Sequence, residues 1–126
     1  MALEIIIIDD DKVFVWLQEK LVKKSQLHAA PHCFLNAKDA LNFIDDNLSP
    51  NSQYLILLDI NMPIMNGWDF LDSIQQKPYT SQIDIIMLSS SIESSDKERA
   101  RNYSLVKEYL EKPLTLELCK KLKQTL

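Results

Sequence analysis

The sequence lacks the marks of a secreted or membrane-spanning protein. Its only two cysteines, Cys33 and Cys119, are far apart and form no Cys-x-x-Cys pattern, which favours two free thiols over a disulfide. No apolar run approaches the roughly 20 residues that a transmembrane helix needs. The N-terminus has neither the basic flank nor the cleavage site of a signal peptide. We therefore expect a cytoplasmic protein that does not bind a membrane.

Basic charge and glycine are also scarce. The formal net charge is −4 over 126 residues, which argues against nucleic acid as a partner because phosphate binding requires basic patches. The single glycine, Gly67, is expected either at a turn with positive φ or where backbone segments approach closely. There is no internal repeat, linker or low-complexity segment, and the length suits one domain. We expect residues 1–126 to form that domain.

Apolar runs alternate with helical patterns along the whole chain. The expected strands are 3–8, 28–35, 54–58, 83–88 and 105–110, and the expected helices are 12–24, 37–48, 68–77, 95–102 and 116–126. The candidate helix N-caps are Asp11, Asn36, Ser95 and Thr115. Ser95 and Glu98 have the spacing of a capping box, and Trp16 and Trp68 are expected to pack their helices onto the fold. Five strands alternating with five helices predict an α/β fold, with a parallel sheet covered on both faces.

The pattern within each run indicates the strand order. The first, third and fourth runs are almost uninterrupted, which is typical of central strands buried on both faces. The second contains Pro31 and two histidines, and the fifth alternates polar with apolar residues, so both are expected at the edges. A flavodoxin-like doubly wound sheet of order 2-1-3-4-5 satisfies these features. In such a sheet, ligands bind outside the carboxyl ends of the strands, where the order reverses between the first and third.

Polar side chains follow four of the five expected strands. Asp9 and Asp10 follow the first, Asp59 the third, Ser89 the fourth and Lys112 the fifth. Taken singly, each is open to an ordinary interpretation as a turn residue, a helix cap or solvated surface. Three carboxylates at one edge, however, would raise one another's pKa unless a cation neutralised them. A hard divalent ion held by few protein oxygens and several waters fits Mg²⁺, which we expect as the cofactor.

Four segments resemble the motifs of response regulator receiver domains, in the same order and spacing and over essentially the whole chain. These segments are 5–11 (IIIIDDD), 57–67 (LLDINMPIMNG), 87–90 (MLSS) and 111–113 (EKP). The resemblance implies a phosphoacceptor in two-component signalling. Asp59 would be the carboxylate nucleophile that forms an acyl phosphate. Asp10, Asp59 and the backbone carbonyl of Asn61 would ligate Mg²⁺, with Asp9 acting mostly through a water, and the metal would offset charge on the transferred phosphoryl group.

The resemblance also assigns the residues around the acceptor. Ser89 would give its hydroxyl to a phosphoryl oxygen, and Lys112 would supply a compensating positive charge. The Lys112–Pro113 bond would be cis, as it is in the family. Tyr109 matches an aromatic switch position on the fifth strand, and it would turn inward when Ser89 moves toward the phosphoryl group.

The resemblance implies one partner that donates the phosphoryl group and another that receives the signal. A sensor histidine kinase or a histidine phosphotransfer protein would donate the phosphoryl group from a phosphohistidine. The output would be binding of a downstream protein, or of a second copy, through the face formed by the fourth helix, fifth strand and fifth helix. That face is expected to carry Arg99, Arg101, Tyr103 and Lys107. We therefore expect a stand-alone signalling module and not an enzyme.

Two alternatives stay open at this point. A hydrolase of the haloacid-dehalogenase type also uses a strand-end aspartate and Mg²⁺, but it requires a second aspartate where this chain has Asn61. A pseudo-receiver would keep the fold and bind partners without phosphorylation, although every site residue is present. The chain also departs from the family pattern in two places. Tyr103-Ser104 stands where receivers usually carry a glycine, and Ser89 replaces the more usual threonine.

Overall fold

The computed structural model describes residues 2–90 and 93–125, so Met1 and Leu126, the ends of the expected domain, lie outside the described residues. The strands are β1 (Ala2–Ile8), β2 (His32–Phe34), β3 (Ser52–Asp59), β4 (Ile83–Ser89) and β5 (Val106–Glu111). The helices are α1 (Lys12–Lys24), α2 (Ala37–Asn47), α3 (Gly67–Ile74), α4 (Ser94–Arg101) and α5 (Leu116–Thr125). A short 3₁₀ helix, η1 (Thr80–Gln82), precedes β4 and was not predicted. None of these helices, within the described residues, is long and apolar enough to cross a membrane.

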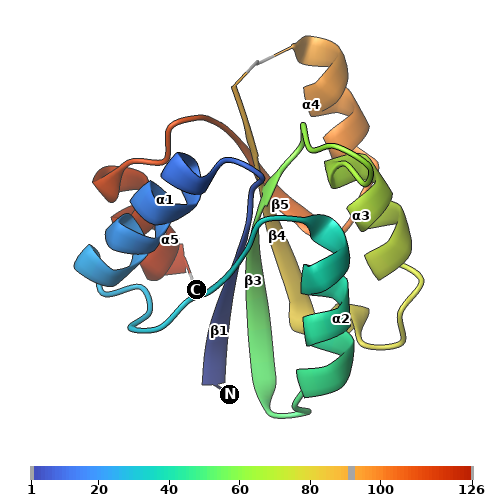
Figure 1. Cartoon of the computed structure of the whole chain (residues 1–126), viewed down its shortest axis with the longest axis horizontal. Helices are drawn as coiled ribbons and strands as arrows, with labels where there is room; N and C mark the ends of the chain where they lie inside the picture. Colours follow the sequence, from blue (N-terminus) through green and yellow to red (C-terminus); the bar gives the residue numbers. More distant parts are fainter. Residues whose placement is uncertain (1, 91–92, 126) are drawn as a thin grey trace.

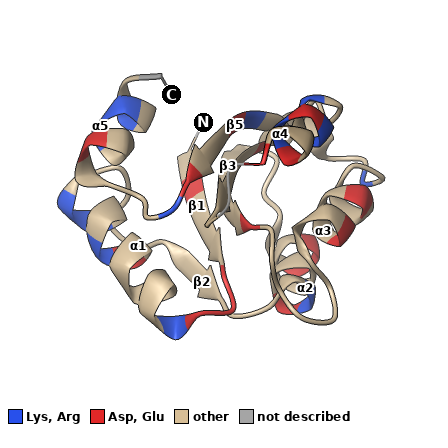
Figure 2. Cartoon of the chain, turned by 90° about the horizontal axis from the view of Figure 1, so that it is seen from above, with Lys and Arg blue, Asp and Glu red and all other residues tan. Residues whose placement is uncertain are grey.

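The strands form one parallel sheet in the order β2-β1-β3-β4-β5, which confirms the predicted topology. Helices α1 and α5 cover one face, and α2, α3 and α4 cover the other (Figure 1, and seen from above in Figure 2). Successive residues of a strand point to opposite faces, so Ile5 and Ile7 enter the core under α1 and α5. Ile6 and Ile8 enter the core under α2 and α3. All four are fully buried, and this burial on both faces explains why the strand is a continuous apolar run.

Side-chain caps fix the starts of three helices as the sequence predicted. The carboxylate of Asp11 accepts from Val13 N at 2.9 Å, and the amide oxygen of Asn36 accepts from Asp39 N at 2.8 Å. Thr115 Oγ1 accepts from Leu118 N at 3.1 Å, just before α5. Each bond satisfies a backbone N–H that has no partner inside its helix. These bonds determine where the three helices begin.

The expected capping box of α4 is wrong. The helix begins at Ser94 with Glu93 as its cap residue, and no side chain among the described residues caps it, so Ser95 already lies inside the first turn. Ala100 is its only buried residue, so α4 buries little apolar surface. Arg99 instead lies 4.4 Å above the Trp68 ring of α3. The attachment of α4 therefore depends on polar and cation–π contacts, which contribute less than apolar burial.

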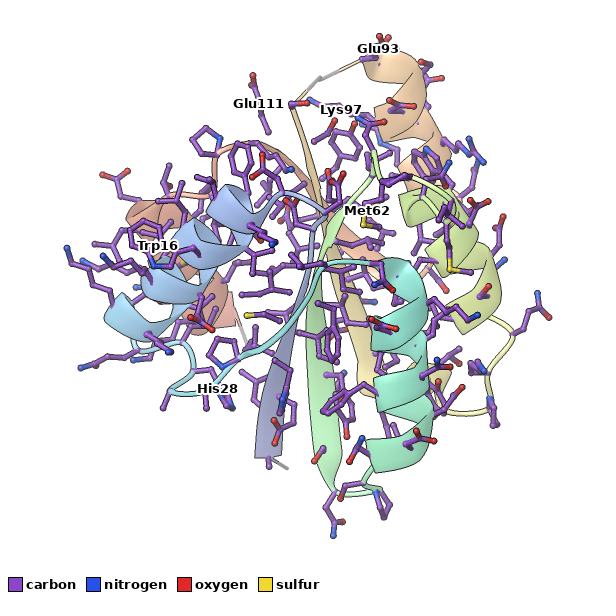
Figure 3. All side chains as sticks on the ribbon, viewed as in Figure 1. Trp16, His28, Met62, Glu93, Lys97 and Glu111 are labelled. Carbon is purple, nitrogen blue, oxygen red and sulfur yellow. The ribbon has the colours of Figure 1, made fainter. Side chains whose placement is uncertain are left out.

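The two tryptophans differ from each other in burial. Trp68 is 7% exposed and packs into the core, as expected. Trp16 is 55% exposed, so the expectation that it packs α1 onto the fold is wrong. It lies on the outer side of α1, with Lys20 Nζ 4.3 Å above its ring (Figure 3). The buried residues of α1 are Gln18 and Val22, which lie on the side of the helix away from Trp16.

Candidate functional site

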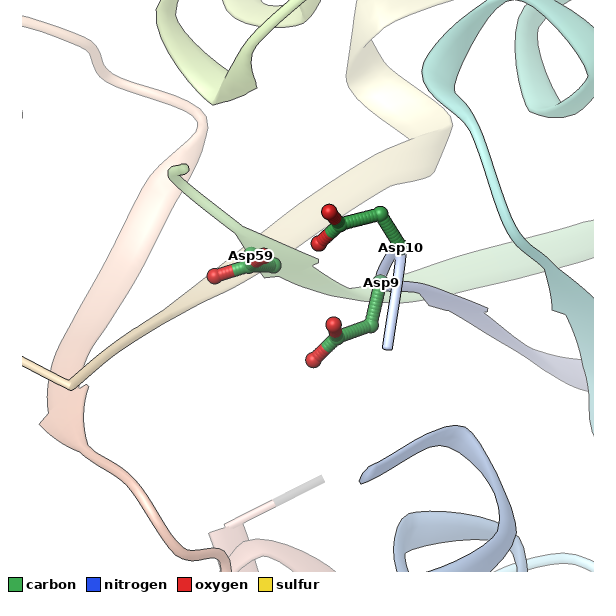
Figure 4. A group of neighbouring side chains, drawn as sticks. All are labelled: Asp9, Asp10 and Asp59. Atoms are coloured by element: carbon green, nitrogen blue, oxygen red, sulfur yellow. The ribbon is translucent and has the colours of Figure 1, made fainter. Parts of the chain in front are cut away.

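Three carboxylates meet at the carboxyl end of the sheet. Asp9 and Asp10 directly follow β1, and Asp59 is the last residue of the neighbouring strand β3. Each offers a carboxylate oxygen, and these oxygens all lie within 4.8 Å of one another (Figure 4). Asp9 is fully buried and Asp59 is 5% exposed, whereas Asp10 is exposed. The predicted acidic cluster is thus present where the strand order reverses.

Lys112 reaches this cluster from the end of β5. Its Nζ lies 2.7 Å from Asp9 Oδ2 and 3.2 Å from Asp59 Oδ1, and its side chain is only 8% exposed. The backbone N–H of Lys112 donates to the carbonyl of Ser89 at 2.7 Å, and the following peptide bond to Pro113 is cis, as expected. Burial strengthens these ion pairs because little water screens them. Lys112 is therefore a buried cation shared by two buried carboxylates.

The crowding shifts the proton affinities in the site. Burial and the neighbouring Asp9 charge raise the pKa of Asp59 from 3.8 to about 6, although Lys112 opposes the change. Burial disfavours the charged form of Lys112, but its bonds to Asp9 and Asp59 outweigh this and raise its pKa. Lys112 therefore stays charged at neutral pH, and Asp59 holds a negative charge that its surroundings only partly compensate.

Two residues of α1 support the site and were missed by the sequence analysis. The Gln18 side chain donates from Nε2 to Asp9 Oδ2 at 3.3 Å. Phe14, one turn earlier, presents its ring 4.4 Å from Lys112 Nζ. Residues four apart share a helix face, so Phe14 and Gln18 lie on the same side of α1. Phe14 was read only as part of a helical pattern and Gln18 was not singled out, because nothing in the sequence specified how α1 is rotated against β1.

Ser89 and Tyr109 lie on the adjacent strands β4 and β5. Ser89 is 1% exposed, and its hydroxyl, which lies near Tyr109, opposes the rise in the tyrosine pKa. Tyr109 is half-buried and packs against the core, and burial raises the pKa of its hydroxyl. The two expected switch residues therefore lie near each other on adjacent strands.

The loop after β3 brings the backbone very close to Asp59. A Cβ placed on Gly67 would lie 2.8 Å from the carbonyl oxygen of Asp59 and 2.8 Å from the Cα of Ile60. The N–H of Gly67 donates to the Ile60 carbonyl at 2.8 Å. Its φ is not positive, so close approach, and not turn geometry, is the reason for glycine here. Asn61, the expected carbonyl ligand, lies exposed in this loop directly after Ile60.

We expect Gly67→Ala to destabilise the protein by about 2 kcal/mol, because the added methyl group meets backbone atoms that cannot move aside. Urea unfolding monitored by circular dichroism measures this change. Ser73→Ala, in the same helix, is the control and should leave stability within about 0.5 kcal/mol of the parent. Equal stability of both variants would show that the loop tolerates a side chain at position 67.

The fold and the site together define a receiver domain, and the comparisons with known proteins agree. The family model of the response regulator receiver domain matches residues 5–123. The chain therefore belongs to the response regulator receiver domain family of two-component signalling. A response regulator receiver protein from Dyadobacter fermentans is 30% identical, with a TM-score of 0.88 over 98% of this chain and 97% of its own. A two-component response regulator from Cytophaga hutchinsonii is 25% identical, with a TM-score of 0.88 over 98% and 96% of the two chains.

The curated relatives are longer proteins. The transcriptional regulatory protein CpxR of Escherichia coli strain K12 is 30% identical over 112 residues, which is 87% of this chain and 43% of CpxR. The chain thus spans less than half the length of this relative. The family model, which matches residues 5–123, covers the strand ends that carry the carboxylates, Ser89 and Lys112.

Proposed function

We propose that this chain accepts a phosphoryl group on Asp59 from a phosphohistidine and passes the signal on by binding, as a signalling module and not an enzyme. The observation that carries the proposal is the buried cluster at the carboxyl end of the sheet, where Lys112 Nζ joins Asp9 and Asp59 at 2.7 and 3.2 Å. Three carboxylates that repel one another would only destabilise the end of a sheet with a purely structural role, so the cluster indicates a function. We take residues 1–126 as one such domain acting in the cytoplasm.

Each residue of the cluster has a chemical role in the transfer. A carboxylate oxygen of Asp59 attacks phosphorus, the P–N bond to the donor imidazole breaks, and the imidazole nitrogen leaves with the electron pair and takes up a proton. Lys112 turns toward the phosphoryl oxygens and balances their charge. The hydroxyl of Ser89 donates to one of these oxygens. Charge stabilisation by such prepositioned groups is what phosphoryl transfer chiefly requires.

The donor set fits Mg²⁺. Asp10, Asp59 and the backbone carbonyl of Asn61 would ligate it, with Asp9 acting through a water. All are hard oxygen donors, and the exposure of Asp10 leaves room for metal-bound waters. When bound, the ion supplies positive charge that offsets the charge on the phosphoryl oxygens.

We expect Mg²⁺ to raise the melting temperature of the parent protein by mass action, and Asp10→Ala to lose most of that increase. The substitution removes a ligand and also one of three repelling charges, so the metal-free variant should melt no lower than the parent. Thermal melts with and without Mg²⁺ measure both effects. Asp46→Ala, an exposed aspartate on α2, is the control and should keep the full response. Equal protection of Asp10→Ala and the parent by Mg²⁺ would remove Asp10 from the ligand set.

Exposed apolar side chains next to the cluster suit a donor protein. Leu35 directly follows β2, Val13 lies in the first turn of α1 after β1, and Ile64 lies in the loop between β3 and α3. They are 42%, 63% and 106% exposed. Ile64 also has φ of 68°, an unfavourable conformation for a β-branched residue. Trp16 extends this apolar surface along α1. A sensor histidine kinase or a histidine phosphotransfer protein would cover these residues while its phosphohistidine reaches Asp59.

The output face is proposed to be α4, β5 and α5. Phosphorylation would draw the Ser89 hydroxyl toward the phosphoryl oxygens, and Tyr109 on the adjacent strand would rotate inward to fill the space that Ser89 leaves. Arg99 and Tyr103 are less available than expected. Arg99 lies over Trp68, and Tyr103 donates to Asp72 of α3 at 2.7 Å. Lys107, with Arg101 beside it, lines the groove between α4 and β5, where a downstream protein or a second copy would bind.

Phosphoramidate tests the proposed function, because its P–N bond stands in for that of a phosphohistidine. Incubation with Mg²⁺ should add one phosphoryl group per chain, and a chelator should prevent this. A pseudo-receiver would gain no mass in this incubation. A haloacid-dehalogenase-type hydrolase would instead turn over an added phosphoester continuously. Either outcome would contradict the proposal.

A further inference from the structure

A buried glutamine supports the acidic cluster at some cost to the fold. Gln18 is 2% exposed, and its Nε2 donates to Asp9 Oδ2 at 3.3 Å. Its other polar atom, Oε1, is buried and has no hydrogen-bond partner among the described residues. Exchanging the two amide atoms would place a carbonyl oxygen against a carboxylate, so the orientation with Nε2 toward Asp9 is the favourable one.

The unpartnered Oε1 indicates why glutamine is present. A buried carbonyl without a partner destabilises the folded state, and an apolar residue of the same shape would avoid this. The neighbouring buried position of α1, Val22, is apolar. Gln18 weakens the fold but directs its N–H donor at the site, and residues of this kind are found mainly where function requires them.

Asp9 has two kinds of partner. Its Oδ1 accepts from the backbone N–H of Asp11 at 3.0 Å. Its Oδ2 accepts from both Lys112 at 2.7 Å and Gln18 at 3.3 Å. Lys112 is shared with Asp59, and under the proposed function it must turn toward the phosphoryl oxygens. Asp9 is fully buried, so its Oδ2 would then lose its strongest donor, and Gln18 would be the remaining side-chain donor to that oxygen among the described residues.

We propose that Gln18 is a positioning residue that keeps Asp9 hydrogen-bonded when Lys112 leaves it for the phosphoryl group. This inference rests on the proposed function and adds to it a residue of α1. Gln18 is held within a helix and stays in place, whereas Lys112 has a long side chain that can exchange partners. The glutamine therefore favours the phosphorylated state over the resting state and should matter little while Lys112 stays on Asp9.

The test compares Gln18→Met with the parent at saturating Mg²⁺, using beryllofluoride as the phosphoryl mimic and calorimetric titration for its affinity. We expect beryllofluoride to bind about tenfold more weakly to the variant, the loss of one hydrogen bond to a charged group. The melting temperature of the metal-free variant should be equal or higher, because the unpartnered carbonyl is gone. Gln18→Leu also removes the donor, and it should weaken beryllofluoride binding by a similar factor.

Gln53→Met is the matched control. Gln53 Nε2 also donates to an aspartate, Asp84 Oδ2 at 3.1 Å, but on β3 and β4 near the opposite end of the sheet. Its substitution should leave beryllofluoride affinity within twofold of the parent. Unchanged beryllofluoride affinity in Gln18→Met would overturn the inference while leaving the proposed function intact. So would equal losses of melting temperature, Mg²⁺ affinity and beryllofluoride affinity, which would indicate a structural role only. A parent that binds no beryllofluoride would instead contradict the proposed function, and this inference with it.

Discussion

Replacing Lys112 with methionine will destabilise the metal-free protein by about 3 to 5 kcal/mol, the usual effect of removing one partner of a buried ion pair. Lys112 is the cation that Asp9 and Asp59 share, and the side chains of both carboxylates are almost fully buried. Without it, Asp9 keeps only neutral donors, and the repulsion between the carboxylates is uncompensated. Urea unfolding in the presence of a chelator measures the loss. Mg²⁺ should restore part of it, because a second cation can replace the first.

Lys77→Met is the control for this prediction. Lys77 Nζ pairs with Asp45 Oδ2 at 2.9 Å, but both side chains are about one-third exposed, and such surface pairs contribute at most about 1 kcal/mol. The contrast between the two lysines depends on burial and not on distance. A loss in Lys112→Met no larger than that in Lys77→Met would mean that the cluster is solvated and not strained.

The metal-free protein should become more stable as the pH falls from 7 to 5, and Asp59 should account for about 1 kcal/mol of the gain. The pKa of Asp59 is about 6 in the folded chain, against an ordinary value of 3.8. A folded-state pKa above the unfolded value means that protonation favours folding. The stabilisation is therefore present at low pH and is lost as the pH rises through about 6.

Asp59→Asn isolates this contribution from other groups that titrate in the same range. The variant should be more stable than the parent at pH 7 in a chelator, because it is permanently neutral where the parent holds a disfavoured charge. The advantage should shrink as the pH is lowered to 5. Chemical unfolding of both proteins at several pH values measures it. A constant difference across the range would show that the carboxyl group of Asp59 does not titrate there.

The arrangement of the site could be predicted because it depends on strand ends. A polar residue that follows a buried apolar run in a parallel sheet must lie at the carboxyl edge. Asp9, Asp59, Ser89 and Lys112 all follow this rule. The strand order then brought Asp9 beside Asp59, and the predicted order was correct because the two edge strands are the least apolar. No distance between side chains was needed for either step.

What the sequence did not reveal depends on side-chain direction. Gln18 and Phe14 contact the site only because α1 is rotated so that this face meets the strand ends, and Trp16 is exposed for the same reason. The start of α4 was predicted at Ser95 from a capping-box pattern, but the helix begins at Ser94 and no side chain among the described residues caps it. The close approach at Gly67 was one of two interpretations, and only the backbone geometry distinguishes them.

The central claim is that Asp59 is the phosphoryl acceptor, and intact mass after incubation with acetyl phosphate and Mg²⁺ tests it most directly. The parent should gain the mass of one phosphoryl group, and the gain should disappear in a chelator and in Asp59→Asn. Asp69→Asn, an exposed aspartate that closes the capping box of α3, should still gain it. Labelling of Asp59→Asn to the same extent as the parent, or no labelling of the parent, would contradict the assignment.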